Sequence, residues 1–92
     1  MTTIRYISIE EFSEFHELEK ELVYEFVEFG LVKAYERERG VCIRNEDILR
    51  LEAGLRLYAD LGVNLEGVEV ILHMREKIRQ LQSRIEELER DL

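Results

Sequence analysis

Residues 8–30 read SIEEFSEFHELEKELVYEFVEFG, and their first half predicts a short helix. Ser8 is a good N-cap, and Glu11 can reach back to the backbone N–H of Ser8, which is the pattern of a capping box. The helix is expected to be about two turns long, because its apolar side soon gives way to charge. That apolar side consists of Ile9, Phe12 and His16, with Phe15 beside them.

A second helix is predicted after a short turn near Glu17 and Leu18. Apolar residues recur with helical spacing from Lys20 to Phe29, and Gly30 supplies the left-handed residue that ends a helix. Two short helices joined in this way form a helix-turn-helix. This motif can recognise DNA or serve only as a structural support.

The pattern changes over residues 31–44. Their two ends, LVKAY and VCIR, favour β-strands, and the middle, ERERG, is charged and contains a glycine, so a small β-hairpin or wing is predicted. Asn45 can cap a third helix that ends at Gly62 and is apolar on two sides, which predicts a central position. Its apolar residues are Ile48, Leu49, Leu51, Leu55, Leu57, Tyr58 and Leu61.

Asn64 can cap a final helix from Leu65 to about Asp91, roughly 40 Å long at 1.5 Å per residue. A domain of 92 residues has no core of that width. Apolar residues at coiled-coil spacing form a narrow seam, and polar residues fill the other positions of the outer part. We expect this seam to pack against a second copy of the chain, giving a homodimer, in preference to its own domain. The dimerisation residues are Ile71, Met74, Ile78, Leu81, Ile85 and Leu88.

The composition suits one small, mainly helical protein. Hydrophobic residues make up 46% of the chain and charged residues 37%, and there is no proline. No run approaches the roughly 20 apolar residues of a membrane span, and the N-terminus has neither a basic start nor an apolar signal core. We therefore expect a cytoplasmic protein without a membrane segment. Residues 1–62 would form a winged helix-turn-helix domain, and residues 63–92 a dimerisation helix.

The net charge of −8 is concentrated near the N-terminus, where residues 1–30 hold eight glutamates against Arg5 and Lys20. Two interpretations stay open at this point. The carboxylates either form a solvated face, or they dock a basic partner together with an aromatic side chain. The candidate partner-binding residues are Glu10, Glu14, Glu17, Glu21, Tyr24, Glu25 and Glu28.

Nothing in the residues argues for an enzyme. The sequence has no glycine-rich phosphate loop, no nucleophile elbow, no pair of Cys-x-x-Cys motifs and no His-x-x-x-His pair. His16 and His73 have no acidic partner fixed by spacing and are interpreted as surface or core-edge histidines. Cys42 is interpreted as a small buried apolar side chain. We expect no catalytic residue, no metal and no cofactor.

Three segments carry a resemblance to a known family: YISIEEF at 6–12, VEFGLV at 27–32 and LGVNLEGV at 61–68. In order and spacing they resemble the MerR-like winged helix-turn-helix family, and within it most closely the chaperone modulators of the CbpM type. This resemblance covers nearly the whole chain. It implies a mainly α fold with a small β-hairpin wing and a long C-terminal coiled-coil helix.

The resemblance also implies a function. Proteins of the CbpM type are non-enzymatic chaperone modulators that bind the J-domain of a DnaJ-like co-chaperone of the CbpA type and inhibit its stimulation of Hsp70. J-domains in that family present a basic helix to Hsp70. An acidic N-terminal face would suit competition for that helix, because opposite potentials steer encounter.

The sequence departs from ordinary MerR regulators at the end of the second helix. Those proteins usually carry an arginine followed by two aromatic residues before the Gly-Leu pair, and the arginine helps to contact DNA. Tyr24 stands at the position of that arginine, and the neighbouring glutamates would repel phosphates. This favours the loss of DNA binding. The alternative is a MerR-family transcriptional regulator that contacts DNA through its basic wing residues, Lys33, Arg37, Arg39 and Arg44.

Overall fold

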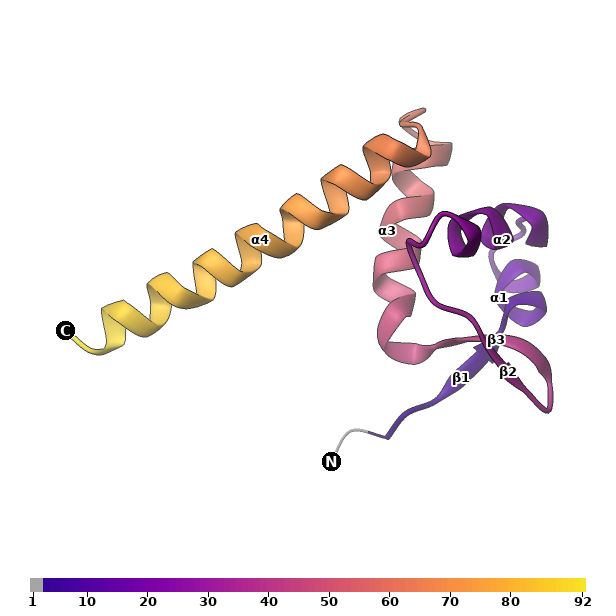
Figure 1. The fold of residues 1–92 in the computed structure, drawn as a ribbon, viewed down its shortest axis with the longest axis horizontal. Helices are drawn as coiled ribbons and strands as arrows, with labels where there is room; N and C mark the ends of the chain where they lie inside the picture. Colours follow the sequence, from indigo (N-terminus) through magenta and orange to yellow (C-terminus); the bar gives the residue numbers. More distant parts are fainter. Residues whose placement is uncertain (1–2) are drawn as a thin grey trace.

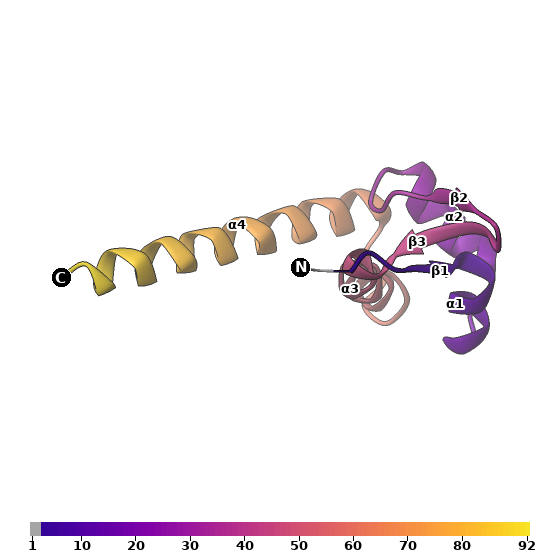
Figure 2. The same cartoon turned by 90° about the horizontal axis from the view of Figure 1, so that it is seen from below.

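A computed structural model describes residues 3–92 of the chain. One long helix leads away from a folded N-terminal part in both views (Figure 1 and Figure 2), and the molecule measures 50 × 36 × 20 Å. The mainly helical fold with a small sheet and a long C-terminal helix is therefore confirmed. In chain order the elements are β1 (Tyr6–Ser8), α1 (Ile9–Phe15), α2 (Lys20–Glu28), β2 (Tyr35–Arg37), β3 (Gly40–Arg44), the short 3-10 helix η1 (Asn45–Asp47), α3 (Ile48–Ala59) and α4 (Leu65–Arg90).

The helix-turn-helix follows the predicted caps closely. The Oγ of Ser8 accepts a hydrogen bond from the backbone N–H of Glu11 at 2.9 Å, so Ser8 is the N-cap of α1. The carboxylate of Glu11 lies 3.6 Å from the guanidinium of Arg39 instead of reaching back to Ser8. Glu17, at φ +54°, makes the tight turn, and Gly30, at φ +87°, follows α2 in the left-handed conformation that favours glycine.

The wing is present, but its strands differ from the prediction in two respects. Glu36 and Arg37, expected in the hairpin turn, belong to β2, and the turn itself is shortened to Glu38 and Arg39 before Gly40. Leu31 and Val32, expected in the first strand, lie in the preceding loop and are 3% and 5% exposed. These two residues are apolar because their side chains are buried although their backbone forms a loop. A pattern of β propensity does not distinguish such buried loop residues from residues of a paired strand.

A third strand, which the sequence did not reveal, completes the sheet. β1 pairs antiparallel with β3, so that Ile7 lies opposite Ile43 and the strand order is β1-β3-β2. With three residues, β1 is too short to show the alternation by which strands are found. The sheet therefore joins the start of the chain to the wing.

The prediction that Asn45 caps the third helix is wrong. Its side-chain oxygen accepts a hydrogen bond from the backbone N–H of Arg5 at 3.1 Å, and its own N–H donates to the Arg5 carbonyl at 2.8 Å. Asn45 thus continues the pairing of β1 with β3, and α3 begins only at Ile48. The competing partner lies 40 residues away in the sequence, so local capping rules could not anticipate it.

The α3 helix lies between α4 and the α1–α2 pair (Figure 1), as expected of a central helix. Only one of its two apolar sides is buried, however. Leu51 and Leu55 belong to the core, whereas Leu49 and Leu61 are 79% and 71% exposed. Gly62, three residues after the end of α3, is in the left-handed conformation, at φ +67°.

The helices approach one another closely at Gly54 of α3. A Cβ placed on Gly54 would lie 2.8 Å from the ring of Phe26 and 3.4 Å from Val68, so α2 and α4 both approach the backbone of α3 there. Such close contact is possible because glycine has no side chain. The buried apolar cluster draws on all four helices and on β3, and it consists of Ile9, Phe12, Val23, Phe26, Leu31, Val32, Ile43, Leu51, Ala53, Leu55, Val68 and Leu72.

The final helix α4 has a buried start and an exposed remainder. The side-chain oxygen of Asn64 accepts a hydrogen bond from the N–H of Gly67 at 2.8 Å, which confirms the predicted N-cap. Val68 and Leu72 are buried, whereas every residue from 73 to 92 is exposed. Within residues 3–92 no helix combines the length and the apolar character needed to cross a membrane.

The close approach at Gly54 generates a stability prediction. We expect Gly54→Val to destabilise the fold by about 2 kcal/mol, because added methyl groups in a filled core cost about 1–3 kcal/mol. The melting temperature should fall by roughly 10 °C in a chain of this size, as measured by circular dichroism. Ala59→Val on the same helix is the control, because Ala59 is exposed. Equal melting temperatures for the two variants would contradict the proposed packing.

Candidate functional site

The exposed side of α2 is acidic. Glu21, Glu25 and Glu28 follow one another at spacings of four and three residues, which places them on one side of a helix. All three are exposed, and the opposite side of α2 carries the buried Val23 and Phe26. Three of the predicted glutamates therefore share one exposed side of α2. Tyr24, which is 36% exposed, lies on the same side.

The other three glutamates of the predicted set lie on α1 and in the turn that follows it. Glu10 and Glu14 are four residues apart on α1, and Glu17 occupies the turn before α2. All are exposed, and none of the ion pairs found within residues 3–92 involves any of the six glutamates. We call the set the acidic surface: Glu10, Glu14, Glu17, Glu21, Tyr24, Glu25 and Glu28.

The wing cations that could contact DNA are partly engaged within the chain. The guanidinium of Arg37 lies 4.2 Å from the ring centre of Tyr6 and donates a hydrogen bond to the Tyr6 hydroxyl at 2.8 Å. Arg44 donates to the hydroxyl of Tyr35 at 3.3 Å and forms an ion pair with Glu46. The hydrogen bond with Tyr35, aided by Glu46, raises the pKa of Arg44 above its ordinary value although burial opposes it, so Arg44 remains a cation. These contacts hold β1 and η1 to the hairpin.

The remaining two wing cations are more accessible. Arg39 pairs with Glu11 at 3.6 Å, but both side chains are largely exposed, and such pairs contribute little to stability. Lys33 is exposed in the loop before β2. The wing therefore offers Lys33 and Arg39 to a phosphate backbone without disturbing the contacts of Arg37 and Arg44.

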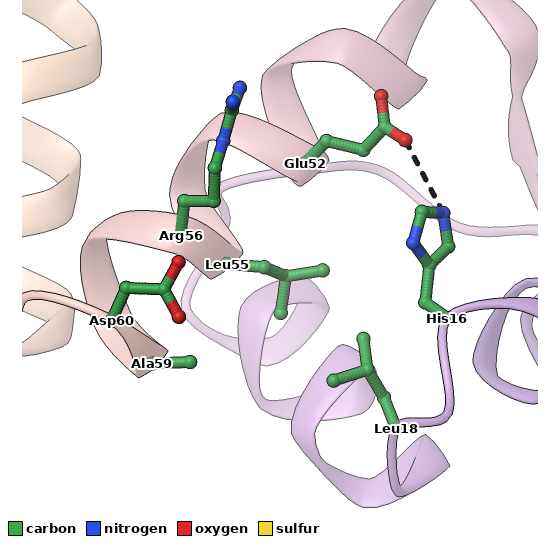
Figure 3. Close-up of a pocket in the computed structure, with 7 residues that line it drawn as sticks. All are labelled: His16, Leu18, Glu52, Leu55, Arg56, Ala59 and Asp60. Carbon is green, nitrogen blue, oxygen red and sulfur yellow. Dashed lines mark ion pairs between the residues drawn. The ribbon is translucent and has the colours of Figure 1, made fainter.

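A pocket that the sequence did not predict lies between the turn after α1 and the helix α3. Its polar edge includes His16 and Glu52, whose Nε2 and Oε2 atoms are 3.3 Å apart (Figure 3). Sequence spacing could not reveal this pair, because the two residues come from different elements. Its full lining is His16, Leu18, Glu52, Leu55, Arg56, Ala59 and Asp60.

The structure places the histidines and the cysteine as the sequence suggested. His16 is a core-edge residue that packs against Phe12, and His73 is exposed on α4. Cys42 is buried, with its sulfur 3.4 Å from the carbonyl oxygen of Gly40. In the described part of the chain, no three His, Cys, Asp or Glu residues are grouped so that they could hold a metal ion.

Phe15, like Leu49 and Leu61, is an apolar residue that the structure leaves exposed. The sequence pattern places it beside the apolar side of α1, yet it is 82% exposed and packs edge-on against His16, at 5.2 Å between ring centres. Its position on the helix carries a signal, because Phe15 follows the exposed Glu11 by four residues and so shares its side of the helix.

The seam of α4 is open in the single chain. Its outer residues are between 52% and 62% exposed, and only Ile71, nearest the domain, is half-buried. A row of large apolar side chains on an otherwise polar helix is typical of a coiled-coil surface. The five exposed residues are Met74, Ile78, Leu81, Ile85 and Leu88.

Comparison with known proteins gives one result. Residues 7–90 match the model of the family described as MerR HTH family regulatory protein. The comparisons with curated proteins and with solved structures gave no match. The matched range runs from β1 through the helix-turn-helix, the wing and α3 to the end of α4. The chain therefore belongs to the MerR HTH family.

Proposed function

We propose that this chain is a non-enzymatic chaperone modulator of the CbpM type. It binds the J-domain of a DnaJ-like co-chaperone of the CbpA type and inhibits the stimulation of Hsp70 by that co-chaperone. One observation carries the proposal: the exposed side of α2, the second helix of the helix-turn-helix, is lined by Glu21, Glu25 and Glu28. The likeness of the sequence to CbpM-type modulators supplies the identity of the partner.

The charges of the acidic surface favour a cationic protein over a nucleic acid. Within residues 10–28 there are eight glutamates and one lysine, Lys20. Proteins gain DNA affinity from counterion release where their cationic side chains meet phosphates. A row of glutamates of this density would instead repel the phosphates. Against a basic helix the same row steers encounter and fixes the register of the two surfaces.

The proposed inhibition works by covering a surface. If the basic helix of the J-domain is held against the acidic surface, it is not available to Hsp70. No chemistry is required of the modulator, and its effect depends on its affinity and concentration. Because the six glutamates make no ion pair within residues 3–92, binding a partner does not require an internal contact to break first.

We also propose that the chain works as a homodimer joined through the seam of α4. Residues 73–92 are exposed throughout, so the seam has no partner within the described part of the chain. Pairing two such helices would bury the Ile, Leu and Met side chains at the heptad positions. The acidic surface lies elsewhere, on α1, α2 and the turn between them, and would remain accessible in each copy.

Charge reversal on α2 tests the partner-binding proposal. The triple variant Glu21→Lys, Glu25→Lys, Glu28→Lys should bind a purified J-domain at least about a hundredfold more weakly, because like charges facing each other cost several kcal/mol. Isothermal titration calorimetry measures this change. The matched control reverses Glu86, Glu87 and Glu89 at the far end of α4, which changes the net charge equally. Unchanged affinity, or equal loss in the control, would remove α2 from the proposal.

A second test concerns the dimer. Replacing Ile78 and Ile85 with aspartate should give a monomer, because carboxylates cannot be buried unpaired in the seam. Sedimentation equilibrium reports the mass, and circular dichroism should show that the domain stays folded, since neither residue contacts the core. The control places aspartate at Gln82 and Ser83, outside the seam. A monomeric parent protein would contradict the dimer proposal.

The second candidate function is that of a DNA-binding transcriptional regulator. The description of the matching family as regulatory and the accessible Lys33 and Arg39 of the wing favour it. Electrophoretic mobility shifts with promoter DNA at about 150 mM salt distinguish the two functions, because phosphate contacts depend steeply on salt. We expect no sequence-specific retardation by the protein alone. Specific, salt-dependent retardation would instead make the chain a DNA-binding regulator.

A further inference from the structure

Phe15 is the most exposed aromatic side chain of the domain, and its surroundings distinguish it from an ordinary surface residue. Single exposed apolar side chains are common in proteins and usually need no explanation. Phe15, however, is 82% exposed and packs by its edge on His16, which itself lines the pocket between α1 and α3. His16 therefore lies between an exposed apolar side chain and a recess.

The pocket has an apolar centre and a polar edge. Leu18 and Leu55 point toward its middle, with the His16–Glu52 pair at one side and Arg56 and Asp60 at the other (Figure 3). A fully desolvated apolar contact ringed by polar groups is the arrangement found at the energetic centres of protein interfaces. Phe15 would extend that apolar centre outward along α1.

The charges around Phe15 indicate the kind of partner. Glu14 and Glu17 flank it in the chain, are exposed and belong to no ion pair found within residues 3–92. At the edge of the pocket, the carboxylate of Glu52 pairs with His16, and the opposite charges of Arg56 and Asp60 cancel in the local sum. The surroundings of Phe15 are therefore acidic, which complements a basic surface.

We propose that Phe15 and the adjoining pocket form the apolar anchor of the acidic surface, at which a basic helix of the partner docks an apolar side chain. This inference rests on the proposed function and adds to it a binding site that the charges alone do not supply. The partner helix would carry an apolar residue on the same face as its lysines and arginines. That residue would enter between Phe15 and the two leucines, while the basic residues meet the surrounding glutamates.

The anchor and the glutamates have separable effects on binding. Exposed charges act mainly on the association rate and on its dependence on salt. A desolvated aromatic contact acts mainly on the dissociation rate, because it forms only in the docked complex. Loss of Phe15 should therefore shorten the lifetime of the complex without changing how its formation depends on salt.

The experiment compares Phe15→Ala, Phe15→Trp and the wild-type chain, each titrated against the purified J-domain by surface plasmon resonance at several salt concentrations. Phe15→Ala should raise Kd at least about tenfold, almost entirely through faster dissociation, as for other aromatic anchors. Phe15→Trp, which keeps a large ring, should stay within a fewfold of the wild type. Ile4→Ala is the control, because Ile4 is also exposed, at 52%, but lies beside Arg5 and Arg37 on the wing side.

The outcomes separate this inference from the proposed function. If the wild-type chain binds and Phe15→Ala binds equally well, or if Ile4→Ala is weakened to the same extent, the anchor is wrong and the acidic surface stands. If the wild-type chain does not bind the J-domain, both proposals fall. Unchanged melting temperatures for all variants, expected because Phe15 and Ile4 are exposed, show that a weaker complex is not the result of unfolding.

Discussion

The contact between the ring of Phe26 and the backbone of α3 at Gly54 holds the parts of this molecule in place. A chain of 92 residues has a thin core, so its helices must approach closely to exclude water. Because Gly54 has no side chain, α2 and the first turns of α4 both reach α3 at the same point. The same packing turns the glutamates of α2 outward and directs the exposed part of α4 away from the domain.

The helix-turn-helix also illustrates that a shared fold does not fix a shared partner. Membership of the MerR HTH family follows from the arrangement of helices, wing and long final helix. Partner choice depends on the side chains at the surface. In this chain Arg37 and Arg44 brace the wing through Tyr6 and Tyr35, and the outer side of α2 is acidic. Both features weaken the case for phosphate contacts and agree with a protein partner.

The residues that stabilise the fold are largely separate from those of the proposed binding surfaces. Buried apolar side chains from four helices and β3 hold the domain together, whereas the glutamates of the acidic surface, Phe15 and the outer seam of α4 are exposed and lie outside the core. Since exposed residues away from caps and cores rarely change stability by more than about 0.5 kcal/mol, these surfaces can be altered without unfolding the domain. The seam on α4 lies apart from the acidic surface on α1, α2 and the turn between them, so the proposed dimerisation and the proposed partner binding would use different side chains.

The sequence by itself determined what local rules control: the caps at Ser8 and Asn64, the glycine at position 30, the seam and the acidic side of α2. Each depends on residues within a few positions of one another, where hydrogen-bond donors, acceptors and helical spacing fix the outcome. Only the tertiary structure decided which distant segments meet. It paired β1 with β3, gave Asn45 a partner at Arg5 and brought Glu52 to His16. These outcomes depend on contacts between segments about 40 residues apart, whose pairing is set by the packing of the whole chain and leaves no periodic signal in the sequence.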